Sequence, residues 1–304
     1  MATPKVDTSL AVTDERRLKA AAVLPHEWVF GAFLVITGLR LLADSVSRDW
    51  AAVFFACLAA CVFMVSWTER NPTADRWRVR LAFYYVAMGI CFFSMGAAVP
   101  LLGTARVDAM LLRWDRDLLG ETPAVLWEPL LRPWLENVAM AGYLFFFYYL
   151  LAGPFYYCFR DVGLFRKSIV GLFTIYGIAL LSYTFLPAAG PHLFMTFHTA
   201  LRGPLLLDST LGLVNRGSNT VDVFPSVHVA ASLYLLLFDW KHWRQRFWWV
   251  LTPCIVLWLS TMYLRFHYFV DIVAGIAVAL VGWWTAQRFA RTQRVELAQY
   301  RVNA

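Results

Sequence analysis

The chain has 304 residues, of which 60% are hydrophobic and only 15% are charged. Soluble globular domains are about 45–50% apolar and about 25% charged, so this composition excludes an ordinary soluble protein and indicates an integral membrane protein. The net charge of +7 does not indicate a nucleic-acid partner, because most basic residues lie in short loops and tails beside apolar segments. The five cysteines lie inside apolar stretches without paired loop spacing, which predicts neither a disulfide framework nor a zinc site.

Apolar stretches long enough to cross a membrane recur along the chain. A transmembrane helix needs about 20 apolar residues, and eight stretches meet or approach that length. They are residues 28–46, 50–68, 80–103, 138–159, 168–187, 226–240, 247–263 and 267–289. The first is weakened by Arg40 and Asp44, and the sixth is short. We therefore expect an all-α integral membrane protein with about eight transmembrane helices.

Basic residues are concentrated in every second connecting segment. These segments are the N-terminal tail of residues 1–27, the loops near residues 70–80, 160–167 and 241–246, and the C-terminal tail of residues 290–304. Cytoplasmic loops are enriched in lysine and arginine, so both tails are predicted to be cytoplasmic. Segments 104–137, 188–225 and 264–266 are then predicted to lie on the other face, which is periplasmic, extracellular or lumenal.

The two long outer-face loops differ from simple linkers. Loop 104–137 combines three tryptophans with six acidic residues and is interrupted by three prolines, which is typical of short helices in the headgroup layer. Such helices form either a lid over a lipid site or interfacial packing without a role in turnover, and both interpretations stay open. Loop 188–225 is long and leads directly into a polar motif, which favours a functional role.

One pair of ionisable residues lies where the last apolar stretch begins. His267 and Asp271 are four residues apart, a spacing that places them on one face of a helix, one turn apart. The carboxylate would then accept a hydrogen bond from one ring N–H and leave the other nitrogen free as a nucleophile or a base. The alternative is a structural pair at the membrane surface. Ionisable groups this deep in a membrane protein are costly to place, which favours function.

A second polar pair lies where the sixth apolar stretch begins. Ser226 follows Pro225 at the predicted start of the helix, where serine is a favoured N-cap, and His228 falls in the first turn. The free amides of a helix start bind anions, so a phosphate held there would meet His228. Taken alone, Ser226 is explained as a cap and His228 as a structural histidine. Two such helix starts on the same predicted face indicate one shared phosphate-handling site.

The two pairs belong to longer motifs that resemble a known family. Phe-Pro-Ser-Val-His at residues 224–228 and His-Tyr-Phe-Val-Asp at residues 267–271, one apolar hairpin apart, resemble the type-2 phosphatidic acid phosphatase superfamily. They resemble most closely the branch that contains the inositol phosphorylceramide synthases. The resemblance covers about residues 168–289. It implies a six-helix core, here the catalytic membrane bundle of residues 80–289, preceded by two additional spans in residues 28–79.

The resemblance also implies a mechanism that uses a phosphohistidine intermediate and neither a metal nor another cofactor. By this resemblance His267 attacks phosphorus, Asp271 orients His267, and His228 protonates the leaving oxygen. Ser226 would bind a phosphoryl oxygen, and Arg265 is the candidate cation for the phosphate. A second acceptor, either water or another alcohol, would then take the phosphoryl group.

The chain departs from the common phosphatases at three points. It lacks their lysine followed seven residues later by Arg-Pro, it has valine in place of glycine in their Pro-Ser-Gly-His, and it has Thr261 where they have an arginine. Gly190 and Pro191 occupy the place of the first element, as in the synthase-like branch. Arg202, Arg216 and Arg265 are the cations available for the phosphate, and a guanidinium suits bidentate phosphate binding. Arg265 reaches the phosphate only if the last helix starts near Phe266.

These features predict a membrane phosphotransferase that moves a phosphoryl or phospho-alcohol group, for example inositol phosphate, from a lipid donor to an alcohol or lipid acceptor. The expected partners are a phospholipid or lipid-phosphate substrate and the membrane, and no nucleic acid. A lipid-phosphate or polyprenyl-pyrophosphate phosphatase is the first alternative, because it shares the site and the first half-reaction. A non-enzymatic transporter or scaffold is the second. The polar residues lie at the ends of predicted spans, which argues against transport.

Overall fold

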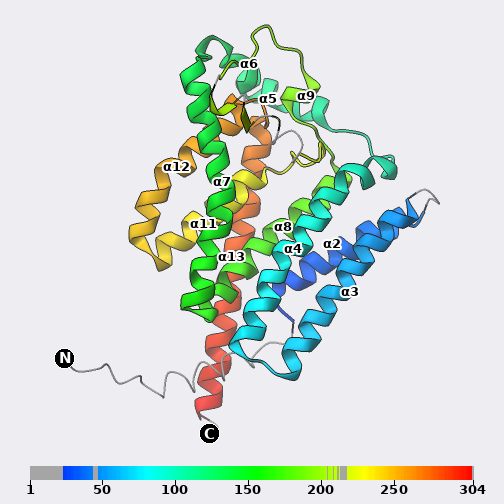
Figure 1. Ribbon diagram of the computed structural model, residues 1–304, viewed down its shortest axis with the longest axis vertical. Helices are drawn as coiled ribbons and strands as arrows, with labels where there is room; N and C mark the ends of the chain where they lie inside the picture. Colours follow the sequence, from blue (N-terminus) through cyan, green and yellow to red (C-terminus); the bar gives the residue numbers. More distant parts are fainter. Residues whose placement is uncertain are drawn as a thin grey trace.

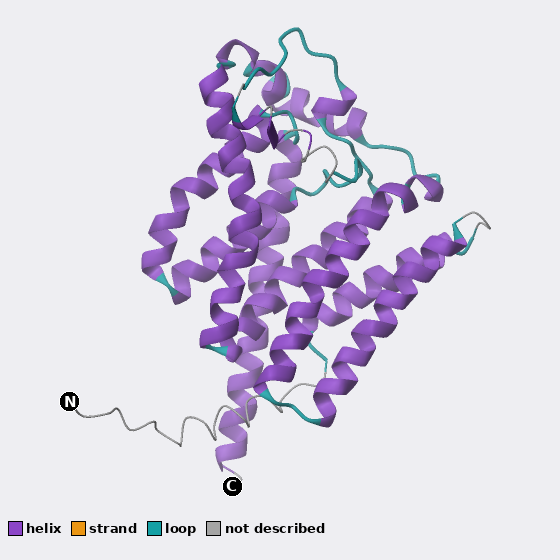
Figure 2. Ribbon diagram, in the orientation of Figure 1, coloured by secondary structure: helices purple, strands orange, loops and turns teal. Residues whose placement is uncertain are grey.

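The structure is a computed structural model that describes residues 23–43, 47–203, 205–207, 209–210, 212 and 218–302. Within these ranges the chain is helical and forms no β-strand, apart from one isolated bridge between Ala188 and Asp222 (Figure 2). The expected all-α architecture is therefore confirmed for the described residues. The predicted tail of residues 1–27 lies mostly outside them, as does Arg216.

Eight long helices follow the order of the predicted spans. They are α2 (Pro25–Leu41), α3 (Arg48–Arg70), α4 (Ala74–Ala98), α7 (Pro133–Arg160), α8 (Val162–Phe185), α11 (Val227–His242), α12 (Arg244–Tyr263) and α13 (Phe269–Val302). Shorter helices connect them: η1 (Pro100–Leu102), α5 (Asp108–Leu119), α6 (Pro123–Leu126), η2 (Glu128–Leu130) and α9 (Pro191–Phe194). Prolines at the first or second position of α6, η2 and α9 break the outer segments into these short pieces.

Five of the long helices are long and apolar enough to cross a membrane: α3, α4, α7, α8 and the first 24 residues of α13. The protein is thus an integral membrane protein by its fold. The other three are α2 with 17 residues, α11 with 16 and α12 with 20, and none of them is both long and apolar enough. The number of eight crossings therefore stays a prediction, although each predicted span coincides with a helix.

The central element of the bundle is α8, which is buried along most of its length (Figure 1). It packs against α2 on one side and against α13 and α11 on another. Close approach of α2 depends on Gly177, because a Cβ atom there would lie 2.9 Å from Val29 Cγ1 and 3.1 Å from Phe30 N. Residues of α2, α3, α4 and the later helices share one hydrophobic core. The two N-terminal helices are thus packed into the bundle. The predicted boundary between the two additional spans and the catalytic bundle, at residues 79 and 80, stays a proposal.

The short helices α5, α6 and α9 gather at one end of the bundle, the top of Figure 1, and α11 and α13 begin below them. The tight connections between α3 and α4 and between α7 and α8 lie at the opposite end. The motifs at residues 224–228 and 267–271 are therefore at the same end of the molecule, under the segment that the sequence indicated as interfacial.

Candidate active site

The contact between His267 and Asp271 is formed at a helix start and not along a helix. Because α13 begins at Phe269, His267 precedes it, and the expected pairing one helical turn apart is wrong in this respect. Asp271 Oδ2 accepts a hydrogen bond from Tyr268 N at 3.0 Å, which caps the helix. The same oxygen lies 3.2 Å from His267 Nδ1. The side chain of Asp271 is fully buried and His267 is 3% exposed, so the pair is shielded from solvent.

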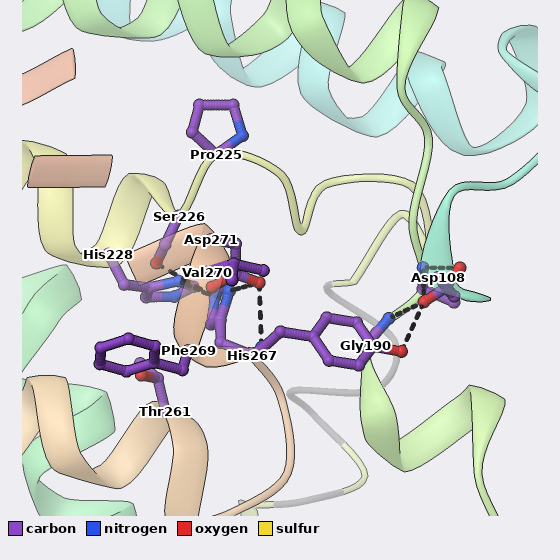
Figure 3. A network of polar contacts seen from close by, with 12 residues as sticks. Asp108, Gly190, Pro225, Ser226, His228, Thr261, His267, Phe269, Val270 and Asp271 are labelled. Carbon is purple, nitrogen blue, oxygen red and sulfur yellow. Dashed lines mark hydrogen bonds and ion pairs between the residues drawn. The ribbon is translucent and has the colours of Figure 1, made fainter. Parts of the chain in front are cut away.

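The other nitrogen of His267 faces the first helical turn of α11. His267 Nε2 lies 3.1 Å from His228 Nδ1 and 3.5 Å from Ser226 Oγ. Ser226 is at the N-cap position of α11, but its side chain makes no capping bond and contacts His267 instead. Figure 3 shows Ser226 and His228 on one side of His267 and Asp271 on the other. The structure thus brings together the four residues that the two motifs contribute.

Two glycines allow the backbone segments of the site to meet. Gly275 faces the start of α11, where an added Cβ would lie 2.6 Å from Ser226 O. Ser226 N in turn donates to Asp271 O at 3.1 Å, which joins the starts of α11 and α13. Gly190 has a φ of +88°, and a Cβ there would lie 2.4 Å from Phe266 O. Any larger residue at either position would separate the segments that carry the histidines.

The aromatic surroundings of His228 come from a helix that the sequence motifs did not include. Tyr143 and Phe146 of α7 lie with ring centroids 4.8 Å and 4.5 Å from the His228 ring. They confine the imidazole to one side, next to His267. Sequence reasoning missed them because their spacing within an apolar stretch is also that of ordinary core residues.

Arg265 is attached to the outer loops. Its Nη2 donates to Glu128 Oε1 at 3.1 Å and to Thr199 O at 2.8 Å, and its guanidinium lies 3.8 Å from the centre of the Phe197 ring. These contacts direct Nη2 toward η2 and the loop after α9. The second candidate cation, Arg202, is exposed. A phosphate-binding role for Arg265 therefore stays a proposal that must accommodate these contacts.

Three buried polar atoms in and beside the site have no hydrogen-bond partner in the described part of the chain. They are Asp271 Oδ1, His192 Nδ1 and Arg265 Nε. Buried polar atoms are nearly always satisfied, so these atoms indicate that a polar ligand or water completes the site. Burial lowers the pKa of His192 to about 4, which keeps its ring neutral at physiological pH. His192 N donates to Arg265 O at 2.8 Å, which ties α9 to the loop before His267.

Asp222 is a further carboxylate near the histidines. Burial raises its pKa to about 6, while a backbone hydrogen bond and the charge of His267 oppose the shift. The residue precedes the first motif and bridges to Ala188. No group of three or more histidine, cysteine, aspartate or glutamate side chains among the described residues has the arrangement of a metal site.

The geometry is that of a membrane protein with a paired-histidine site at one end of a helical bundle. A model described as the PAP2 superfamily matches residues 109–285, more than half of the chain, which includes every site residue named above. The chain therefore belongs to the PAP2 superfamily. This membership supports a membrane enzyme of lipid-phosphate chemistry.

A curated protein gives a narrower comparison. An inositol phosphorylceramide synthase from Candida albicans is 45% identical to this chain over 58 residues. Those residues are 19% of this chain and only 12% of that protein, so the match is local. No solved structure matches the chain significantly.

Proposed function

We propose that the protein is a membrane phosphotransferase that moves a phosphoryl or phospho-alcohol group from a lipid donor to an alcohol or lipid acceptor. The observation that carries this proposal is the position of His267, whose Nδ1 faces Asp271 and whose Nε2 faces His228 Nδ1 at 3.1 Å. One nitrogen is thereby oriented by a buried carboxylate, and we propose the other, beside His228, as the atom that attacks phosphorus.

The first half-reaction forms a phosphohistidine. His267 Nε2 attacks phosphorus, the bond between phosphorus and the lipid oxygen breaks, and His228 donates a proton to that oxygen. Asp271 accepts a hydrogen bond from His267 Nδ1–H and stabilises the positive charge that the ring acquires. Ser226 Oγ, 3.5 Å from Nε2, would donate to a phosphoryl oxygen.

The second half-reaction reverses these roles. The acceptor hydroxyl gives its proton to His228, its oxygen attacks phosphorus, and the bond between phosphorus and His267 Nε2 breaks. Water as the acceptor would make the protein a phosphatase. The local match to a protein named for inositol phosphorylceramide synthesis favours a lipid alcohol and an inositol phosphate group.

The site is proposed to open on the non-cytoplasmic face. The connections at the end opposite the site include residues 70–74 and 160–162, which carry or adjoin Arg70, Arg76, Arg160 and Arg166 (Figure 1). The positive-inside rule assigns that end to the cytoplasm, together with both termini. The lipid substrate would then come from the outer or lumenal leaflet.

The test uses purified full-length protein in detergent micelles with phosphatidylinositol that is radiolabelled in its headgroup phosphate. Ceramide or no acceptor is added, with and without a metal chelator. We expect a labelled acceptor lipid only when an acceptor is present, at a rate that the chelator does not change. His267→Gln should form no labelled product. Wild-type protein should carry a labelled histidine after a short incubation without acceptor, and His267→Gln should not.

Two results would decide against the transferase. Release of soluble inositol phosphate at the same rate with and without acceptor would establish a hydrolase. Full activity in His267→Gln would exclude the phosphohistidine mechanism and favour a site elsewhere. Phosphatidic acid in place of phosphatidylinositol tests whether a phosphomonoester is the better donor.

A further inference from the structure

The outer helix α5 presents two buried carboxylates toward the site. Asp108 and Asp115 are seven residues apart, on the same face as Leu111 and Leu112, and both aspartates are fully buried. The two leucines pack in one cluster with Tyr268, the residue after His267. This segment was expected to be interfacial, and its contacts show that one of its faces lies directly on the loop before α13.

Asp115 caps the helix that carries Asp271. Its Oδ2 accepts from Phe269 N and its Oδ1 from Val270 N, both at 3.0 Å. The first amides of a helix have no partner within the helix, so a carboxylate from another element holds this end in place. Thr122 Oγ1 also donates to Asp115 Oδ2, at 2.7 Å.

Asp108 joins the two segments on either side of the site. Its Oδ1 accepts from Gly190 N at 2.9 Å and from Ala189 N at 3.0 Å. The same oxygen accepts from Tyr268 Oη at 3.1 Å. One buried oxygen thus connects the segment between α8 and α9 to the residue that follows His267.

His267 lies between these attachments. Phe266 O is in contact with Gly190, Tyr268 is bonded to Asp108, and the helix that follows is held by Asp115. The bond from Tyr268 N to Asp271 Oδ2 connects this framework to the carboxylate that orients His267. The position of the imidazole is therefore determined through α5, although no atom of α5 is bonded to it.

We propose that Asp108 and Asp115 are positioning residues for His267, which rests on the proposed function of that histidine. They hold the loop so that Nε2 faces His228 and Nδ1 faces Asp271. A role restricted to general stability makes a different prediction, because it lowers the amount of folded protein without changing the turnover of the molecules that remain folded.

The experiment compares Asp115→Asn and Asp108→Asn with two matched controls. Asparagine keeps the side-chain volume of aspartate. Its NH₂ group is a hydrogen-bond donor, however, and would face a backbone N–H that is also a donor. Thr122→Val removes the third bond to Asp115 without affecting the loop amides. Glu121→Gln removes the same charge from a nearby carboxylate, whose hydrogen bonds go to Arg116 and to Thr122 N.

Two measurements are made on folded, purified protein. Hydrogen exchange of peptides covering residues 264–275 reports the anchoring of the loop independently of catalysis; we expect exchange at least about tenfold faster in Asp115→Asn and unchanged in both controls. In the transfer assay we expect kcat to fall by about 10²-fold, as for a displacement of about 1 Å, with KM changed less than about twofold. Both controls should keep wild-type kcat.

The outcomes separate the two proposals. Faster exchange with unchanged kcat would overturn the positioning role, and so would unchanged exchange in both aspartate variants. A wild-type protein without transfer activity would contradict the proposed function, while the exchange data would still test the attachment of the loop. If the asparagine variants do not fold, Tyr268→Phe removes only one hydroxyl from Asp108, and it must lower kcat by about tenfold for the proposal to stand.

Discussion

Replacing Gly275 by alanine tests whether the two histidines depend on the close approach of α11 and α13. The added Cβ would lie 2.6 Å from Ser226 O, whereas ordinary contact begins at 3.4 Å, so the helices must separate by about 0.8 Å. The obstacle is a backbone oxygen in the first turn of α11, which cannot rotate away as a side chain would. The contact of 3.1 Å between His228 Nδ1 and His267 Nε2 would lengthen by a similar amount.

A displacement of about 1 Å at reacting groups costs about 10²-fold in rate, and we expect kcat of Gly275→Ala to fall by that order. The assay is phospholipid transfer at matched concentrations of folded protein, with melting temperature measured in parallel. Gly89→Ala is the control, because this glycine also lies within a helix and an added Cβ there meets no atom within 4 Å. A Gly275→Ala protein with wild-type kcat would refute the view that the site depends on this contact.

Three further predictions concern the carboxylates and the arginine. Asp271→Asn should lower kcat by about 10³- to 10⁴-fold, as loss of the orienting carboxylate does in a serine-protease triad, whereas a purely structural pair would lower only stability. If the buried Nε of Arg265 contacts the phosphate, Arg265→Gln should raise KM for the lipid donor about tenfold, whereas Glu128→Gln should leave it unchanged. Equal effects on KM in the two variants would assign Arg265 to loop anchoring alone. Asp222 has its pKa raised by burial from 3.8 to about 6, so the folded state binds the extra proton and stability falls as pH rises from about 4 to about 6. The melting temperature of Asp222→Asn should therefore exceed that of the wild type above pH 6 and converge with it below about pH 4; a constant difference across that range would contradict the assignment.

The outer segments show where sequence patterns stop being informative. Proline and tryptophan in residues 104–137 predicted short helices, and α5, α6 and η2 are present. The pattern did not show that Asp108 and Asp115 face inward, because their spacing equally suits a solvated face. Their partners, Ala189, Gly190 and the start of α13, are more than 70 residues away in the chain. Only the folded chain identifies such contacts.

The amino-acid sequence by itself determined the membrane character, the helical class and the four residues that meet at the site. Hydrophobic composition and the two short motifs are local properties, and local properties can be read along a chain. The tertiary structure decided what those residues contact: His267 lies before its helix, Ser226 does not act as a cap, and Arg265 is bonded to Glu128. These outcomes depend on backbone segments that approach each other only after packing, and so no pattern of neighbouring residues encodes them.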